Sequence, residues 1–270
     1  MYKLVAIDID GTLMNDRKEI TKEVNDAIQA ARAKGVRVVI CTGRPIVGVQ
    51  SIIEELKLND KDDYVVTFNG ALVQNTHTNE VESQITLTYE DLKELYKLSL
   101  KINSPLHFFD TENLYTPNRD INRYTIHEAH INQIPLHYRP IAEVPTDMII
   151  PKVMFIDEPE HLNHIIANIP ESIWDKYALV KSAPFFLEFL DPSVSKGNAV
   201  KQLAEKLSIK QEEVICIGDG ENDVSMIEYA GCGVAMGNAE SVVKEVAQFQ
   251  TLSNNENGVA YAIEKLVLNK

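Results

Sequence analysis

The sequence predicts an α/β fold, in which a doubly wound parallel sheet carries an inserted α+β domain. Strand-like apolar runs alternate with helix-like segments at the start of the chain, which is typical of a parallel sheet covered by helices on both faces. This pattern stops near Leu87 and returns at Asp191. A chain of 270 residues has room for one large domain or two moderate ones. We therefore expect a core of residues 1–86 and 191–270 and an inserted domain of residues 87–190.

The first predicted strand, residues 3–7, leads into the segment Asp8-Ile9-Asp10-Gly11-Thr12. Side chains at positions i and i+2 of an extended chain point the same way, so we expect the two aspartates to lie together. Gly11 can adopt backbone conformations closed to other residues, which lets the chain turn there. Thr21 is suited to cap a helix that ends at Gly35, because the residues between them form one apolar stripe at helical spacing.

Two further strands complete the first part of the predicted core. Residues 36–41 precede the segment Thr42-Gly43-Arg44-Pro45, whose proline suits the first turn of a second helix. Residues 64–68 precede Asn69. Ligands of doubly wound sheets bind beyond the carboxyl ends of the strands. The polar residues that follow these strands are therefore candidates for one site.

The predicted inserted domain has short elements in mixed order. The segment from Thr88 to Asp91 has the pattern of a helix start with a capping box. The β-rich runs that follow do not alternate regularly with helices, so we expect antiparallel pairing. The expected strands cover residues 106–109, 152–156, 177–181 and 185–190, and the expected helices cover residues 119–131 and the segment from Glu158.

The alternating pattern returns in the last part of the chain. Ser195 can cap a helix that begins at Lys196. The buried run of residues 214–217 is followed by the polar segment Gly218-Asp219-Gly220-Glu221-Asn222-Asp223. The remaining elements are expected to be helices at residues 224–229 and 258–268 and strands at residues 233–236 and 249–252.

The charge and cysteine content exclude several classes of protein. Forty acidic against 26 basic residues give a formal charge of −14, which argues against nucleic-acid partners and anionic membranes. The three cysteines, Cys41, Cys216 and Cys232, have no metal-type spacing and fit a reducing compartment. Asp8 and Asp10 interrupt the first apolar run, so it is not a signal peptide, and no uncharged stretch is long enough to cross a bilayer. We expect a cytoplasmic protein with no membrane partner.

The strand-end residues form a chemically coherent set. Converging carboxylates repel one another unless a cation joins them, and hard oxygen ligands suit Mg²⁺. With Mg²⁺, a hydroxyl and the point charge of a lysine, such a site becomes a receptor for a dianionic phosphoryl group. Each residue alone has an ordinary explanation as a turn, a helix cap or a solvated side chain. If there were no shared site, every one of these ordinary explanations would have to apply at once. One common site is therefore favoured for Asp8, Asp10, Thr42, Lys196, Asp219 and Asp223.

These segments resemble the four motifs of the haloacid dehalogenase superfamily of phosphatases. The motifs are Asp8-Ile9-Asp10-Gly11-Thr12, Thr42, Lys196 and the segment Gly218–Asp223, in that order. The resemblance implies a Rossmann-like core, and it identifies the insertion as a C2-type cap domain. Thr42-Gly43-Arg44-Pro45 and the last segment further resemble the Cof-type sugar phosphatases of this superfamily.

The resemblance also implies a role for each motif residue. Asp8 would be the nucleophile that forms an aspartyl-phosphate, and Asp10 would be the general acid and base. Mg²⁺ would be held by the side chains of Asp8 and Asp219 and by the main-chain carbonyl of Asp10. The phosphoryl oxygens would bind the backbone amide near Ile9, Thr42, the Gly43 amide, Lys196 and Asn222. Asp223 would support Lys196 or the metal shell.

We therefore expect a Mg²⁺-dependent phosphatase for small phosphorylated metabolites, with sugar phosphates as the expected substrates, acting as a monomer or homodimer. One alternative is a phosphomutase, which returns the phosphoryl group from the same aspartyl-phosphate to a bound sugar. Another is a non-catalytic phospho-acceptor resembling a receiver domain, which needs neither Asp10 as an acid nor a cap. A phosphatase would release free phosphate, and a phosphomutase would yield isomerised sugar phosphate. A phospho-acceptor would be phosphorylated once per chain without turnover.

Overall fold

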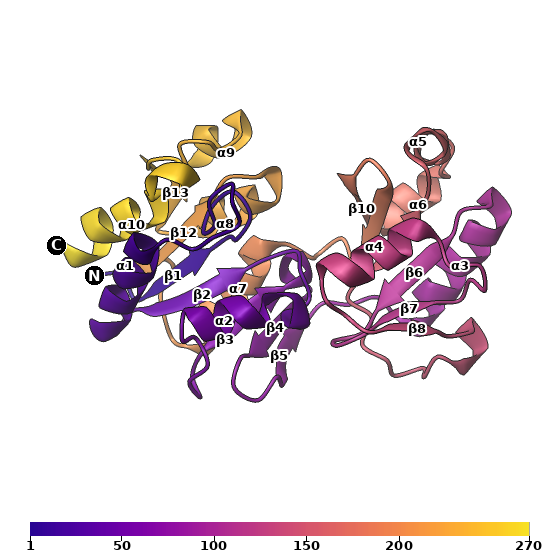
Figure 1. The fold of residues 1–270 in the computed structure, drawn as a ribbon, viewed down its shortest axis with the longest axis horizontal. Coiled ribbons are helices and arrows are strands. Elements are labelled where there is room, and N and C mark those ends of the chain that lie inside the picture. The colour runs from indigo at the N-terminus through magenta and orange to yellow at the C-terminus, as the bar shows by residue number, and fades with distance from the viewer. Residues whose placement is uncertain (270) are drawn as a thin grey trace. The chain divides into compact units, whose positions relative to one another are not determined.

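The computed structural model describes residues 1–269, which divide into two compact units (Figure 1). Unit 1 consists of Met1–Gly43, Ser51–Ser83 and the chain from Ser195 onward. Unit 2 consists of Arg44–Gln50 and Gln84–Val194. No helix within residues 1–269 is long and apolar enough to cross a membrane.

Unit 1 is built on an eight-stranded sheet in the order β14-β13-β12-β1-β2-β3-β4-β5. Every strand pair from β14 to β3 is parallel, whereas β4 runs antiparallel to β3. The predicted fold class is confirmed, and the edge formed by β4 and β5 is an addition that the sequence pattern did not predict. The strands are β1 (Leu4–Ile7), β2 (Arg37–Cys41), β3 (Tyr64–Thr67), β4 (Leu72–Asn75), β5 (Val81–Gln84), β12 (Val214–Gly218), β13 (Cys232–Ala235) and β14 (Phe249–Gln250).

The central strand β1 pairs with one strand from the early part of the chain and one from the late part. Ile7 lies beside Ile40 of β2 on one side and beside Ile217 of β12 on the other. All four residues of β1 are fully buried, as expected for a parallel strand that is covered on both faces. The segment that follows β1 therefore emerges at the middle of the sheet.

The helices of unit 1 begin where the sequence supplies caps. The Thr21 hydroxyl accepts a hydrogen bond from the Val24 amide, and the Ser195 hydroxyl accepts one from the Asn198 amide. Both predicted caps are confirmed. Helix α1 packs against α10 close to both chain termini, and α7 packs against α8 (Figure 1). The helices are α1 (Lys22–Ala33), α2 (Gln50–Glu55), α7 (Lys196–Lys206), α8 (Val224–Tyr229), α9 (Ser241–Val246) and α10 (Gly258–Ile263), with short turns η2 (Phe68–Gly70), η4 (Gln211–Glu213), η5 (Glu221–Asp223), η6 (Asn254–Glu256) and η7 (Glu264–Leu268).

Unit 2 is an α+β unit on a six-stranded sheet in the order β10-β11-β9-β6-β7-β8. Its strand pairs are antiparallel except for β7 with β8, which is parallel. The capping box at Thr88 is confirmed, because its hydroxyl accepts from the Asp91 amide and the Asp91 carboxylate accepts from the Thr88 amide. The elements are α3 (Tyr89–Ile102), β6 (Leu106–Phe109), β7 (Leu114–Thr116), α4 (Arg123–Ile131), β8 (Leu136–Tyr138), β9 (Val153–Ile156), α5 (Pro159–Ala167), α6 (Glu171–Lys176), β10 (Ala178–Ala183) and β11 (Phe186–Leu190), with turns η1 (Ile46–Val49) and η3 (Ile141–Glu143).

Candidate active site

Neighbouring strands of unit 1 deliver three of the predicted residues to the same edge of the sheet. Asp8 follows β1, Thr42 follows β2 and Asp219 follows β12, and these strands are parallel neighbours. The carboxyl ends of parallel strands meet at one edge, where a doubly wound sheet binds ligands. Asp8 and Thr42 are both buried, so the site is partly closed to water.

Lys196 is the electrostatic centre of the site. It is the first residue of α7 and is fully buried. Its Nζ lies 2.6 Å from Asp8 Oδ1 and 2.6 Å from Asp223 Oδ1. A lysine buried to this extent requires paired charges, and the two carboxylates supply them. The solvated helix lysine that the sequence alone would suggest is therefore excluded.

Asp223 serves as a structural brace for this lysine. Its Oδ1 accepts from Lys196, and its Oδ2 accepts from the backbone amides of Asp219 and Gly220 at 2.9 and 3.1 Å. Both of its oxygens thus have partners within the protein. Asp223 therefore joins Lys196 to the loop that carries Asp219.

Burial shifts the pKa values of the acidic groups. Burial raises the pKa of Asp8 to about 7, with the carboxylates of Asp223 and Asp219 adding to the effect and Lys196 opposing it. The pKa of Asp219 is raised mainly by burial, although a hydrogen bond from Thr12 opposes the shift. Burial alone would lower the pKa of Lys196, but Asp8 and Asp223 outweigh it and raise that pKa. The site therefore holds more negative charge than one lysine neutralises.

The residues present fit a divalent cation. Asp8, Asp219 and Asp223 each offer a carboxylate oxygen, and these oxygens lie within 4.8 Å of one another. Lys196 donates to Oδ1 of the Asp8 carboxylate. A Cβ on Gly11, whose φ is +86°, would lie 2.3 Å from Asp219 Oδ2, so only glycine leaves room for that carboxylate. Carboxylate oxygens of this kind are the ligands that Mg²⁺ prefers.

Asp10 follows the end of β1, two positions after the buried Asp8. Its carboxylate is partly exposed and forms an ion pair with Lys18, with Nζ 2.8 Å from Oδ1. The chain already turns after Asp8, because the Leu13 amide donates to the Asp8 carbonyl and the Met14 amide to the Ile9 carbonyl. The two aspartates are therefore in unlike environments, one buried beside a lysine and one near water.

Of the predicted phosphate-binding residues, Ile9, Thr42, Gly43 and Asn222 lie beyond the ends of β1, β2 and β12, whereas Lys196 begins α7. The side chain of Ile9 is fully buried, which leaves its backbone as the polar group. Asn222 Nδ2 donates to Asn69 Oδ1 at 3.0 Å, and a Cβ on Gly43 would lie 3.1 Å from that same oxygen. Asn69 thus brings Asn222 close to Gly43, a role that its position after the third predicted strand did not indicate.

Two contacts of the site were not predicted from the sequence. Thr12 Oγ1 donates to Asp219 Oδ1 at 2.6 Å, and Asn238 Nδ2 donates to the Gly11 carbonyl at 2.8 Å. Asn238 lies three residues after the end of β13. It could have been found by the strand-end argument that identified Asp8 and Asp219. The partner of Thr12, by contrast, is visible only in the folded chain.

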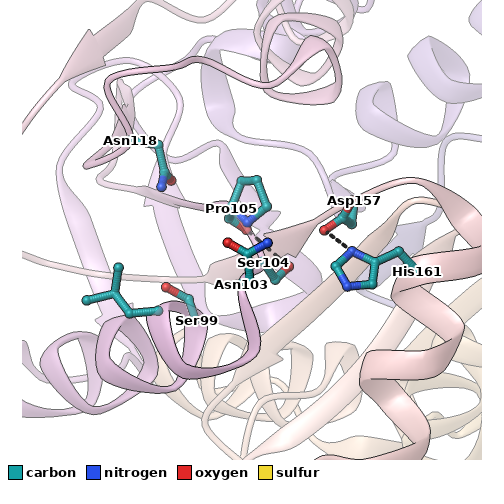
Figure 2. Close-up of a pocket in the computed structure, with 8 residues that line it drawn as sticks. Ser99, Asn103, Ser104, Pro105, Asn118, Asp157 and His161 are labelled. Carbon is teal, nitrogen blue, oxygen red and sulfur yellow. Dashed lines mark hydrogen bonds and ion pairs between the residues drawn. The ribbon is translucent and has the colours of Figure 1, made fainter.

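A separate pocket of about 310 Å³ lies within unit 2 (Figure 2). It is lined by residues of α3 and α5 and by the loops beside them, and it contains none of the predicted site residues. Figure 2 shows Asp157 and His161 facing each other, with a carboxylate oxygen 2.8 Å from His161 Nδ1. The lining includes no lysine or arginine, so this pocket lacks the positive charge that a phosphoryl group requires.

The fold and the site together define an α/β protein in which a buried lysine lies among aspartates at the carboxyl edge of a parallel sheet. A family model described as haloacid dehalogenase-like hydrolase matches residues 5–263, and the chain belongs to this family. The chain is 61% identical over 270 residues to YxeH of Bacillus subtilis, covering 100% of both chains.

Solved structures of haloacid dehalogenase-like proteins are similar to this chain. A haloacid dehalogenase-like hydrolase from Bacteroides thetaiotaomicron gives a TM-score of 0.88 at 31% identity, covering 98% of this chain and 100% of that one. The subclass IIB sugar phosphatase BT4131 gives a TM-score of 0.76 at 26% identity, covering 97% and 98%. The prediction of a phosphoric monoester hydrolase is confirmed at the level of the family.

Proposed function

We propose that the protein is a Mg²⁺-dependent phosphatase that hydrolyses small phosphorylated metabolites through an aspartyl-phosphate on Asp8. The observation that carries this proposal is Lys196, which is fully buried and contacts Asp8 directly, with Asp219 beside them. Three carboxylates and one lysine leave an excess of negative charge, which a divalent cation would offset so that an anionic phosphoryl group can bind.

Asp8 is proposed as the nucleophile. Lys196 fixes this carboxylate by donating to Oδ1, and one of its oxygens attacks phosphorus. Lys196 neutralises the charge on the transferred group, and Thr42, the Gly43 amide, the amide near Ile9 and Asn222 hold its oxygens. Positioning and charge neutralisation are the main contributions that a protein makes to phosphoryl transfer.

Asp10 is proposed as the general acid that protonates the leaving oxygen and then as the base that takes a proton from the attacking water. Its partly exposed carboxylate, which pairs with Lys18, can exchange protons with solvent. Asp8 is buried among charges, so the two carboxylates can divide the nucleophile and acid roles between them.

The carboxylates of Asp8 and Asp219, with the main-chain carbonyl of Asp10, would hold Mg²⁺. When bound, the ion neutralises phosphoryl charge. Asp223 braces Lys196 and the loop that carries Asp219, as its hydrogen bonds indicate.

Sugar phosphates are the proposed substrate class, in a cytoplasmic setting, because BT4131 is named as a sugar phosphatase and is similar to nearly the whole chain. The inserted domain, residues 87–190, is then the part that selects the organic portion of the substrate and excludes water from the reaction. A screen of phosphorylated metabolites, run with Mg²⁺ and with EDTA, tests this proposal. Release of free phosphate from sugar phosphates only with Mg²⁺ is the expected result.

The same assay separates the alternatives. A phosphomutase would yield an isomerised sugar phosphate instead of free phosphate. A receiver-like phospho-acceptor would take up one phosphoryl group per chain without turning over p-nitrophenyl phosphate. Either result would contradict the proposed hydrolase.

A further inference from the structure

Four asparagines of unit 1 contact the segment that follows β1. They lie at position 238 and in the segment 254–257, and the segment that they contact runs from Gly11 to Thr21. An asparagine side chain both donates and accepts, so a single residue can join two backbone segments. The contacting residues are Asn238, Asn254, Asn255 and Asn257.

Two of these asparagines form a continuous bridge. Asn238 Nδ2 donates to the Gly11 carbonyl at 2.8 Å, and its Oδ1 accepts from the Asn254 amide at 2.9 Å. Asn254 Nδ2 in turn donates to the Met14 carbonyl at 3.1 Å. The bridge thus holds the segment Gly11–Met14 at both of its ends.

Thr12 lies inside the segment that the bridge holds. Its side chain is buried, and its hydroxyl donates to Asp219 Oδ1 at 2.6 Å. Asn238 Nδ2 also lies 3.5 Å from Asp219 Oδ2. The bridge therefore fixes Thr12, which orients Asp219. The segments that carry Asn238 and Asn254 supply none of the proposed Mg²⁺ ligands.

We propose that Asn238 and Asn254 are positioning residues for the Mg²⁺ ligands, acting through Gly11, Thr12 and Asp219. This role rests on the proposed function, because it presumes a metal at Asp219. Groups that orient a metal ligand without touching the ion tune metal affinity, and losing one typically weakens it by about 10- to 100-fold.

Asn255 provides a matched control from the same segment. It exchanges hydrogen bonds with Asp16, at 3.1 Å to the backbone amide and 2.9 Å to the carboxylate, and Asn254 also donates to that carboxylate at 3.1 Å. Asp16 lies beyond Met14, outside the held segment. Asn255→Ala therefore removes asparagine contacts to the same loop without breaking the bridge.

The experiment measures Mg²⁺ binding by isothermal titration calorimetry on the full chain, together with p-nitrophenyl phosphate turnover as Mg²⁺ is raised and the urea midpoint of unfolding. Asn238→Ala and Asn254→Ser are expected to weaken Mg²⁺ binding by about 10-fold or more. Their turnover should recover at saturating Mg²⁺, which activity lost through unfolding would not do. Asn255→Ala should bind Mg²⁺ with wild-type affinity.

Wild-type affinity in both bridge variants would overturn the positioning role, as would an equal loss in Asn255→Ala. Because Asn238 is exposed, Asn238→Ala gives a folded variant for this comparison even if Asn254→Ser unfolds. A wild-type protein that neither binds Mg²⁺ nor turns over substrate would overturn the proposed function itself. That result is distinct from a failure confined to the positioning role.

Discussion

Lys196 Nζ lies 2.6 Å from Asp8 Oδ1, although the two residues are 188 positions apart in the chain. The contact forms because β1 lies beside β12 in the sheet and α7, which begins at Lys196, packs against α8. Asp223 holds the same ammonium group from the other side. Predictions about catalysis and stability both follow from this buried arrangement.

Replacing Lys196 with methionine should abolish turnover and destabilise the fold. The change leaves Asp8 and Asp223 buried without a counter-charge, and removing one partner of a buried ion pair costs about 3–5 kcal/mol. Urea unfolding and phosphate release measure the two effects. Lys201→Met, an exposed position on the same helix, is the control and should match the wild type. Wild-type turnover in Lys196→Met would contradict the site.

Asp8→Asn should reduce phosphate release to background while the chain stays folded. An amide of nearly the same shape cannot attack phosphorus, so no phosphoryl-enzyme forms. Phosphate release and mass spectrometry of the intact chain after mixing with substrate measure the outcome. Asp26→Asn, on the exposed side of α1, should be fully active. An active Asp8→Asn protein would refute the mechanism.

Gly11→Ala should lower both stability and Mg²⁺ affinity. Alanine at a φ of +86° is strained by roughly 1–3 kcal/mol, and its Cβ would lie 2.3 Å from Asp219 Oδ2. Gly35 has a φ of +80° with no atom within 4 Å of the added Cβ. Gly35→Ala should therefore lose stability but keep Mg²⁺ affinity. Equal affinity in the two variants, measured by calorimetry, would show that Gly11 matters only for its backbone.

Low pH should lower the free energy of unfolding, because Asp91 becomes protonated. Partial burial acts to raise the pKa of Asp91, but hydrogen bonds from Lys176, Thr88 and Tyr177 outweigh it and lower the pKa to about 2. An unfolded aspartate has a pKa of about 3.9, so this stabilisation is complete above about pH 4 and is lost as the pH falls towards 2.

Asp91→Asn tests this pH dependence. Its free energy of unfolding should be below the wild-type value at pH 7, and the difference should shrink as the pH falls from about 4 towards 2. Urea titrations across this range measure it, with the exposed neighbouring change Glu90→Gln as the control. A deficit that stays constant with pH would assign the loss to the cap hydrogen bonds alone.

The sequence was most informative where local rules decide the structure. Thr21, Thr88 and Ser195 cap their helices as their residue types and positions indicated. Polar residues directly after apolar runs identified Asp8 and Asp219, because a parallel sheet brings its strand ends together.

The remaining features depend on partners distant in the sequence. Strand β4 contains Gln74 and Asn75 and does not look like a buried strand, but pairing with β3 buries it, and Gln74 accepts a hydrogen bond from Thr67. The direction of Asp10 depends on a turn that places it beside Lys18. No sequence pattern specifies such tertiary contacts, so these features could be found only in the folded structure.

The central place of β1 has a consequence for synthesis on the ribosome. Leu4–Ile7 leave the ribosome well before Val214–Gly218, the strand that pairs with them on one side. Unit 2 consists mostly of the continuous stretch Gln84–Val194, so its strands can pair before β12 has been made. The strand that precedes Asp8 therefore stays unpaired on one side until Val214–Gly218 have been synthesised.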